Sequence, residues 1–437
     1  MSRRLDDILC RAGTARATAR LARLEARGET AGGAVERRVR RIVADVRRRG
    51  DRALVEWTAQ LDGVRLAPAR LRVPQDDLAA AFRDLPRVQR RDLTLAASRI
   101  RAFHARQRER SWSYRDATGA RMGLRVAPLE RVGVYVPGGR AAYPSTVLMT
   151  AIPARVAGVD QVIATSPAGP AGYPPIILAA CHVAGVDALY RVGGAQAVAA
   201  LAYGTATVAR VDKVVGPGNI YVATAKRLCY GQIDIDAIAG PSEILVLADG
   251  SADARLIAAD MLAQAEHDPL AAAVCLTPDA RLAVRVLAAL ASQLATLPRR
   301  AIATRSLAAY GAVVVTRSLA EAVALADRLA PEHLELLVRD PARWTPRVRH
   351  AGAIFVGPHT PEAFGDYLAG PNHVLPTGGT ARWASPLGVY DFIKRTSLIE
   401  ATPRTLARLG PAVVRLAALE GLDGHGRAVS RRLAGGR

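Results

Sequence analysis

The segment VGVYVPGG at residues 132–139 decides the fold that we expect for this chain. A short apolar run ends in a Pro-Gly-Gly turn, and a helix is predicted from about 145 to 157. The order of strand, turn and helix recurs through QVIATSP, ALYRV before Gly193-Gly194, and VDKVVG before Pro217-Gly218-Asn219. Short apolar strands alternating with helices indicate a parallel sheet with crossover helices.

A second series of the same kind begins after Gly240. Apolar strands are predicted at 244–249, 272–278, 312–316 and 351–357, with helices between them. The fold class is therefore α/β, with two doubly wound, Rossmann-like lobes in series. Ligands of such sheets are expected at the carboxyl ends of the strands. No GxGxxG fingerprint occurs, but the turns at 137–139, 193–194 and 216–218 offer backbone amides to a phosphate.

The remaining patterns divide the chain into regions. Apolar residues recur at helical spacing in 35–61 and 87–107, and the residues from 387 onward look helical but too short to fold alone. The expected regions are an Arg-rich helical arm (1–30), a helical part packing on the second lobe (31–129), the first lobe (130–242), the second lobe (243–386) and a C-terminal tail (387–437).

Composition excludes several classes of protein. The formal net charge is +21, but only three of the 60 basic residues are lysines, and no basic block is interleaved with aromatics. We attribute the arginines to a compositional habit and discount nucleic-acid binding. No apolar run approaches the length of a membrane span, and the first residues do not resemble a secretory signal. Four scattered cysteines form no CxxC pair, so a cytoplasmic protein is expected.

The predicted helix SADARLIAADMLAQAEHDP at 251–269 carries an unusual stripe. Ile257 and Met261 are apolar, whereas Gln264 and His267 on the same face are polar. Buried polar groups need partners. The pair is either satisfied within a hydrogen-bond network or supplies two metal ligands, and the helix alone leaves both readings open.

Three polar constellations follow later in the chain. Glu332 and His333 are adjacent after Pro331, and a His is suited to proton transfer near neutral pH. Asp366 and His373 lie in a polar, loop-like segment after a predicted strand, where functional residues often occur. The tail holds EGLDGH at 420–425. Taken alone, each of these polar groups could also consist of surface residues without a catalytic or binding role.

Eight short strings, taken in order, resemble the histidinol dehydrogenase family, the enzymes of the last step of histidine biosynthesis. Any one of them is weak, but their order along nearly the whole chain is specific. The strings are VGVYVPGG (132–139), VGGAQA (192–197), VGPGN (215–219), AGPSE (239–243), QAEH (264–267), PEHLEL (331–336), GDYLAGPNHVLPTGG (365–379) and EGLDGH (420–425).

The resemblance implies a zinc-dependent, four-electron oxidation of L-histidinol to L-histidine through histidinaldehyde, with two NAD. It implies a homodimer with exchanged tails, so that the tail residues serve the partner's site. The implied residues are Gln264, His267, Asp366 and His425 for one zinc ion per subunit; Glu332 and His333 for acid-base catalysis; Ser242, His373 and Glu420, with Glu332 and the zinc ligands, for histidinol; and Tyr135, Gln196 and Asn219 for NAD.

Two alternatives remain from other readings of the residues. One is an NAD-dependent dehydrogenase of the same fold that acts on another small alcohol. The other, from a different class, is a basic nucleic-acid-binding protein. A covalent route through a cysteine thiol is a further variant, but Cys181, Cys229 and Cys275 fall in predicted helices and strands, where structural thiols are expected.

Overall fold

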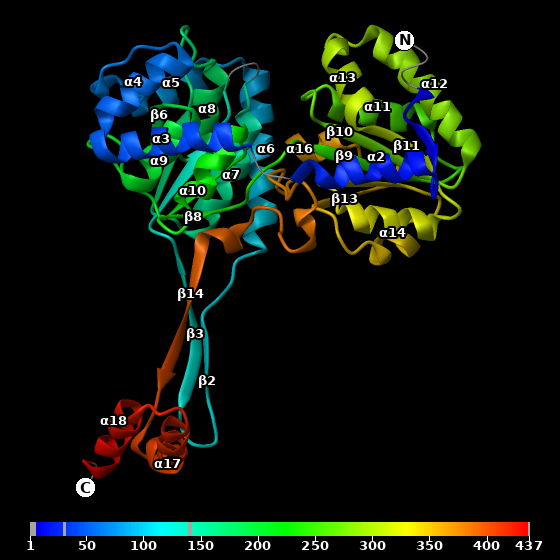
Figure 1. The fold of residues 1–437 in the computed structure, drawn as a ribbon. Coiled ribbons are helices and arrows are strands. Elements are labelled where there is room, and N and C mark those ends of the chain that lie inside the picture. The colour runs from blue at the N-terminus through cyan, green and yellow to red at the C-terminus, as the bar shows by residue number, and fades with distance from the viewer. Residues whose placement is uncertain (1–5, 29–31, 139–141, 436–437) are drawn as a thin grey trace.

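The computed structural model describes residues 6–28, 32–138 and 142–435. Two α/β lobes lie side by side, and a narrow β-ribbon leads from the first lobe to two helices at the C-terminal end (Figure 1). The mixed α/β class and the two parallel sheets expected from the sequence are confirmed. Gly139, part of the first predicted glycine turn, lies outside the described residues.

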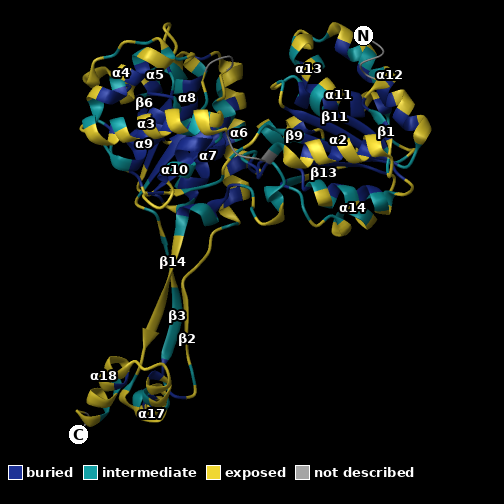
Figure 2. Cartoon of the chain, viewed as in Figure 1, coloured by how far each residue is buried: buried dark blue, intermediate teal, exposed yellow. Residues whose placement is uncertain are grey.

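The first lobe is built on a parallel sheet with the strand order β6-β5-β4-β7-β8. The chain switches direction across the sheet at β4, the strand that opens the series. Its crossover helices are almost entirely apolar and lie buried against both faces (Figure 2). The elements are β4 (Arg131–Tyr135), α7 (Pro144–Ala157), β5 (Gln161–Ser166), α8 (Pro175–Ala184), β6 (Ala188–Arg191), α9 (Gly194–Tyr203), β7 (Lys213–Val215), α10 (Ile220–Cys229) and β8 (Asp234–Ile235).

The helices between residues 33 and 105 pack on the first lobe, so the expectation that the part at 31–129 packs on the second lobe is wrong. Helix α3 contacts α9 and α10, α5 contacts α8, and α6 contacts α7. The stripe Val39, Ile42, Val43 and Val46 joins the alanine-rich face of α9 in one core. An apolar stripe predicts that a helix is covered but does not specify by which lobe. These helices are α3 (Gly33–Arg49), α4 (Asp51–Asp62), α5 (Gln75–Asp84) and α6 (Arg87–Ala105).

The second lobe has the parallel strand order β1-β11-β10-β9-β12-β13. Its strands are β1 (Leu9–Arg11), β9 (Glu243–Ala248), β10 (Ala272–Thr277), β11 (Gly311–Val315), β12 (His333–Leu337) and β13 (Ala353–Val356). Its helices are α2 (Ala15–Glu25), α11 (Ala254–Ala265), α12 (Ala280–Thr296), α13 (Arg300–Tyr310), α14 (Leu319–Leu329), α15 (Pro341–Trp344) and α16 (Glu362–Tyr367). Strand β12 was not expected from the sequence.

The N-terminal residues are not a separate helical arm. Strand β1 pairs in parallel with β11 at the edge of the second sheet. Helix α2 follows it and buries Ala17, Leu21 and Leu24 against the same lobe. The arm expected at 1–30 is therefore, over its described part, an edge strand and a covering helix of the second lobe.

A third, antiparallel sheet forms the ribbon, with the order β14-β3-β2. It joins β2 (Trp112–Arg115), β3 (Arg121–Pro128) and β14 (Ile393–Glu400), and the tail ends in α17 (Pro403–Leu419) and α18 (Asp423–Ala434). The tail expected at 387–437 thus includes a long strand, which pairs with residues about 270 positions earlier. Its first residues, Leu387, Val389 and Phe392, belong to the core of the first lobe.

Short 3-10 turns complete the described secondary structure at Ala26–Gly28, Pro68–Arg70, Thr345–Arg347, Thr380–Arg382 and Val389–Phe392. Among the helices of residues 6–28, 32–138 and 142–435, none combines the length and apolar character that a membrane crossing needs.

Candidate active site

Glu332 and His333 lie at the amino end of β12, and both are buried. The Nδ1 atom of His333 is 3.0 Å from the carbonyl oxygen of Glu243, at the start of the neighbouring strand β9. The backbone amide of Glu243 donates to Oε2 of Glu332 at 3.0 Å. One residue of β9 therefore fixes both members of the pair. In this lobe the two residues lie at the amino end of the strand, whereas the sequence led us to expect ligands at the carboxyl ends of the strands.

The surroundings of the pair set its protonation. Burial lowers the pKa of the His333 imidazole to about 4, so the ring is neutral at physiological pH. Burial, with the nearby Glu243 carboxylate, raises the pKa of Glu332 well above its usual range. A neutral imidazole can accept a proton, and a buried carboxyl group with a raised pKa is typical of catalytic acids and bases.

Helix α16 brings further carboxylates to the same place. Glu362 and Asp366, one helical turn apart, form with His333 a group whose potential ligand atoms all lie within 4.8 Å of one another. Oε1 of Glu362 is 3.7 Å from Nε2 of His333. His373 also belongs here, because its Nδ1 is 3.2 Å from the carbonyl oxygen of Asp366. The structure thus brings together Asp366, His373 and the Glu332–His333 pair.

Glu362 is a site residue that the sequence analysis missed. Its side chain is 2 % exposed, and burial beside Asp366 raises the pKa of its carboxyl group to about 8. The available signal was its position four residues before Asp366, which places both on one face of a helix. The segment reads as a loop from sequence because α16 is short and follows Pro361.

The side-chain amide of Gln264 has the burial and the free polar atoms expected of a metal ligand. Gln264 lies in the last turn of helix α11 with a fully buried side chain, and neither Oε1 nor Nε2 has a hydrogen-bond partner among the described residues. Such a group costs about 1–3 kcal/mol unless something else binds it. His267 follows beyond the helix end and is exposed. The residues present therefore fit a cation held at the end of α11.

Ser242 lies directly before β9, next to Glu243, where its backbone oxygen accepts from Ala272. Glu420 and His425 lie elsewhere. Both are exposed on the C-terminal helices, at the far end of the ribbon from the lobes (Figures 1 and 2). A single chain therefore keeps these two tail residues apart from the group around His333.

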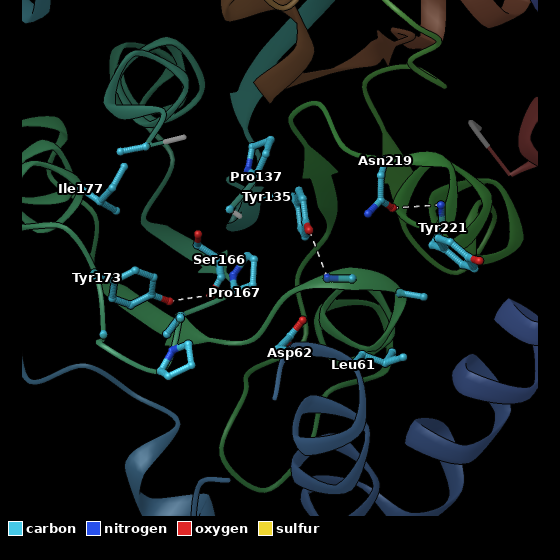
Figure 3. A pocket seen from close by; sticks show the side chains of 18 of the residues that line it. Leu61, Asp62, Tyr135, Pro137, Ser166, Pro167, Tyr173, Ile177, Asn219 and Tyr221 are labelled. Atoms are coloured by element: carbon cyan, nitrogen blue, oxygen red, sulfur yellow. Dashed lines mark hydrogen bonds between the residues drawn. The ribbon is translucent and has the colours of Figure 1, made fainter. Parts of the chain in front are cut away.

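The first lobe contains a cavity of about 810 Å³ at the carboxyl ends of its strands. Tyr135 at the end of β4 and Asn219 before α10 line it, and so do Asp62 and Tyr173 (Figure 3). The hydroxyl of Tyr135 accepts a hydrogen bond from the backbone amide of Gly194, at the start of α9. The start of α10 also faces the cavity. Helix N-termini favour anions, so the cavity suits a dinucleotide with its phosphates near these helices.

Gln196 occupies a different position from Tyr135 and Asn219. Its side chain is fully buried and is not among the described residues that line the cavity. A Cβ atom added to Gly194 would lie 2.6 Å from its Oε1, so Gln196 packs directly beneath the floor. Its Nε2 is 3.4 Å from Asp62. We therefore expect Gln196 to support the turn that meets a ligand.

The four cysteines do not supply a catalytic thiol. All of them are buried. Burial raises the pKa of Cys181, Cys229 and Cys275 to about 12, and it also raises that of Cys10. Because the thiolate is the nucleophile, these groups are inert. The cysteine variant of the mechanism has no support in this geometry.

Comparison with known proteins identifies the family. A family model described as histidinol dehydrogenase matches residues 25–433. The chain belongs to the histidinol dehydrogenase family. Histidinol dehydrogenase of Syntrophotalea carbinolica is 56% identical over 415 residues, which is 95% of this chain and 96% of the relative. That of Geobacter metallireducens is 53% identical over 411 residues, 94% of each chain. Membership makes the chain an enzyme of the oxidoreductase class.

The fold agrees with this assignment. A crystal structure of histidinol dehydrogenase from Elizabethkingia anophelis superposes with a TM-score of 0.91 at 33% sequence identity, covering 98% of both chains. The resemblance read from eight short strings is therefore confirmed at the level of the family.

The Gln264 amide generates a prediction about metal binding. With zinc as the probe ion, we expect Gln264→Met to weaken metal binding by more than the roughly 10–100-fold that loss of a hydrogen-bond partner of a metal ligand costs. In the presence of a chelator the same variant should unfold at a higher temperature than the wild type, because it removes an unpartnered buried amide. Zinc content and thermal unfolding with and without chelator measure both effects. Gln293→Met, which removes a side chain that donates to the carbonyl of Arg255, is the control and should keep its zinc.

Proposed function

We propose that the protein oxidises L-histidinol to L-histidine through histidinaldehyde, with two NAD per turnover and one zinc ion per subunit. This reaction would be the final step of histidine biosynthesis. The observation that supports it best is the buried Glu332–His333 pair, fixed by Glu243 next to Glu362 and Asp366. The names of the relatives agree with this substrate. The cytoplasmic location expected from the sequence stays a prediction.

The tautomer of His333 indicates which of its atoms acts. A carbonyl oxygen only accepts, so the contact between Nδ1 and the Glu243 carbonyl requires a proton on Nδ1. In the neutral ring, Nε2 then carries the free lone pair. Nε2 is on the side of Glu362, away from β9. We infer that Nε2 of His333 removes the hydroxyl proton of the alcohol, and that Glu243 holds the ring for this step.

Glu332 is proposed to serve the second oxidation. Conversion of an aldehyde to an acid adds the oxygen of a water molecule, and a base must take the proton of that water. Glu332 is adjacent to His333 in the chain, and its Oε2 lies 3.7 Å from the ring. In its ionised form it accepts the proton, and in its protonated form it can act as an acid. In this proposal His333 serves the oxidation of the alcohol and Glu332 serves the oxidation of the aldehyde.

The proposed zinc site combines Gln264, His267, Asp366 and, from a second subunit, His425. Two imidazoles, one carboxylate and one amide oxygen suit zinc and leave the site net positive. When bound, the ion would orient the amine and imidazole of the substrate, one of the recognised roles of a metal. Ser242, His373 and Glu420 are proposed to contact histidinol as well. The unpartnered amide of Gln264 supports this donor set.

NAD is proposed to bind in the cavity of the first lobe, with Tyr135 and Asn219 in contact with it and Gln196 beneath the floor. When bound, it supplies the hydride acceptor for each oxidation. The volume of the cavity and the two helix N-termini at its edge support this placement.

A homodimer with exchanged tails is proposed because Glu420 and His425 lie apart from the other proposed site residues of the same chain. Helix α17 presents an apolar stripe to solvent through Leu409, Val413, Leu416 and Leu419, of which Leu419 is 85 % exposed. Such a stripe is typical of a surface that another subunit covers. Exchange of a terminal element is an accessible route to a dimer. It would deliver Glu420 and His425 to the partner's site.

The stoichiometry tests the proposed reaction. Each L-histidinol consumed should yield two NADH and one histidine, with little free aldehyde, because one site performs both oxidations. Absorbance of NADH, together with chromatography of the products, gives the ratio. A ratio of one with accumulating aldehyde would show that the enzyme stops after a single oxidation.

Substitutions at 332 and 333 separate the two steps. His333→Asn should slow alcohol oxidation by about 10²–10⁴-fold, the usual contribution of general acid-base catalysis. Glu332→Gln should slow the oxidation of histidinaldehyde, supplied directly, by a similar factor. Steady-state rates with each substrate make the comparison. Normal aldehyde oxidation by Glu332→Gln would remove the water-activating role.

Mixed dimers test the shared site. His425→Asn and Asp366→Asn, each expressed alone, should hold little zinc and show little activity. Co-expressed with different affinity tags and purified through both, they should regain part of the activity. In such a dimer one site carries both defects and the other carries none. If each site is built from one chain, every site keeps a defect, and verified mixed dimers stay inactive.

A further inference from the structure

The lysines of this chain mark unusual positions. Only Lys213, Lys226 and Lys394 occur among 60 basic residues, and the other 57 are arginines. Lys394 is exposed, but the side chains of Lys226 and Lys213 are only 2 % and 6 % exposed and are ion-paired. An ammonium group is compact with tetrahedral donors, whereas a guanidinium group is larger and planar. In a chain that uses arginine almost everywhere, a buried lysine indicates a place that a guanidinium does not fit.

Lys226 reaches from α10 to the turn that precedes this helix. Its Nζ donates to the backbone oxygen of Gly216 at 3.0 Å and also to Oδ1 of Asp236, just after β8. The other carboxylate oxygen, Oδ2 of Asp236, accepts from the backbone amide of Gly216 at 2.7 Å. The ion pair therefore holds both backbone polar groups of Gly216 at once. Buried, charge-assisted hydrogen bonds of this kind are strong and directional.

Gly216 is a position where the backbone has little freedom. Its φ is +112°, and a Cβ atom there would lie 2.3 Å from the backbone oxygen of Tyr135. The turn that begins at Gly216 ends at Asn219, whose Oδ1 accepts from the amides of Tyr221 and Val222 at the start of α10. The side-chain nitrogen of Asn219, Nδ2, is then available to a ligand in the cavity. Both Tyr135 and Asn219 line the cavity (Figure 3).

We propose that Lys226 and Asp236 are positioning residues for the dinucleotide cavity. By fixing Gly216, they set the distance between the β4 end, which carries Tyr135, and the turn that carries Asn219. Neither Lys226 nor Asp236 is among the described residues that line the cavity, so both act through the turn. This inference rests on the proposed binding of NAD in the cavity.

The other buried lysine provides a matched control. Nζ of Lys213 is 3.0 Å from Asp234 and 3.6 Å from Asp391. It lies in the same lobe, on β7, and is buried and ion-paired in the same way. Its contacts join β7 to the start of β8 and to the segment before β14, and not to the turn. A general loosening of the lobe would follow from changing either lysine, whereas an effect on the cavity should follow from Lys226 alone.

The experiment compares Lys226→Arg with Lys213→Arg in the full-length protein. Calorimetric titration measures the Kd of NAD, and steady-state kinetics give KM for NAD, KM for histidinol and kcat. Zinc content and the midpoint of thermal unfolding are measured alongside. We expect Lys226→Arg to raise the Kd and KM of NAD about tenfold, as loss of one charge-assisted contact would. The KM of histidinol and the zinc content should stay within twofold. Lys213→Arg should leave the Kd of NAD within twofold even where it lowers the unfolding midpoint.

Asp236→Asn gives a second route if Lys226→Arg does not fold. It keeps the size of the side chain but removes the charge that Lys226 pairs with, and it should also raise the Kd of NAD. The inference is overturned if Lys226→Arg or Asp236→Asn binds NAD as the wild type does. It is equally overturned if Lys213→Arg weakens NAD binding as much as Lys226→Arg.

Measurements of NAD binding and histidinol oxidation by the wild type distinguish a failure of this inference from a failure of the proposed function. A wild type that binds NAD but does not oxidise histidinol would refute the proposed reaction, while the binding comparison would still decide the role of Lys226. A wild type that does not bind NAD would overturn both the placement of NAD and the positioning role.

Discussion

The parallel pairing of β9 with β12 is the interaction on which the arrangement of Glu332 and His333 depends. In this register His333 lies opposite Ile244, which brings the backbone of Glu243 next to the side chains of the proposed acid-base pair. Its amide contacts Glu332 and its carbonyl contacts His333. A slip of one residue would turn every side chain of β12 to the other face of the sheet. The side chain of Glu243 also contacts Arg27 and the backbone amide of Gly378, so the 3-10 turn after α2 and the segment after α16 both meet the start of β9.

The two lobes share a strand order around β4 and β9, but their proposed sites lie at opposite edges of the sheets. The carboxyl edge of a parallel sheet gathers the N-termini of the following helices, and their positive ends suit the phosphates of a dinucleotide. The amino edge gathers helix C-termini, whose negative ends suit a cation. Gln264 lies in the last turn of α11 and Asp366 in the last turn of α16, both at this edge of the second lobe. The choice of edge thus matches the charge of the ligand proposed for each lobe.

Most of the fold was predictable because the local sequence patterns agree with the strands and helices that form. Apolar runs that end in glycine turns recur through both lobes, and they gave the two parallel sheets and most crossover helices. Strand β12 was missed because its first residue, His333, and the preceding Glu332 look like a polar turn after Pro331, although both are buried. The ribbon was missed because its strands are largely exposed and β14 pairs with β3 across more than half of the chain. The site residues came mainly from eight ordered strings, since periodicity alone left Gln264 and His267 open. Glu362 belongs to none of these strings and emerged only from its contacts.

The burial of Leu387, Val389 and Phe392 in the first lobe has a consequence for biosynthesis on the ribosome. Most of this lobe is encoded before residue 240, but these three residues emerge only after the whole second lobe has been synthesised. The N-terminal elements of the second lobe, β1 and α2, are already available by then. The later-encoded lobe can therefore complete its core before the earlier one. Until then the apolar surface beside α7 that these residues cover stays exposed in the nascent first lobe, and exposed apolar surface of this kind favours aggregation.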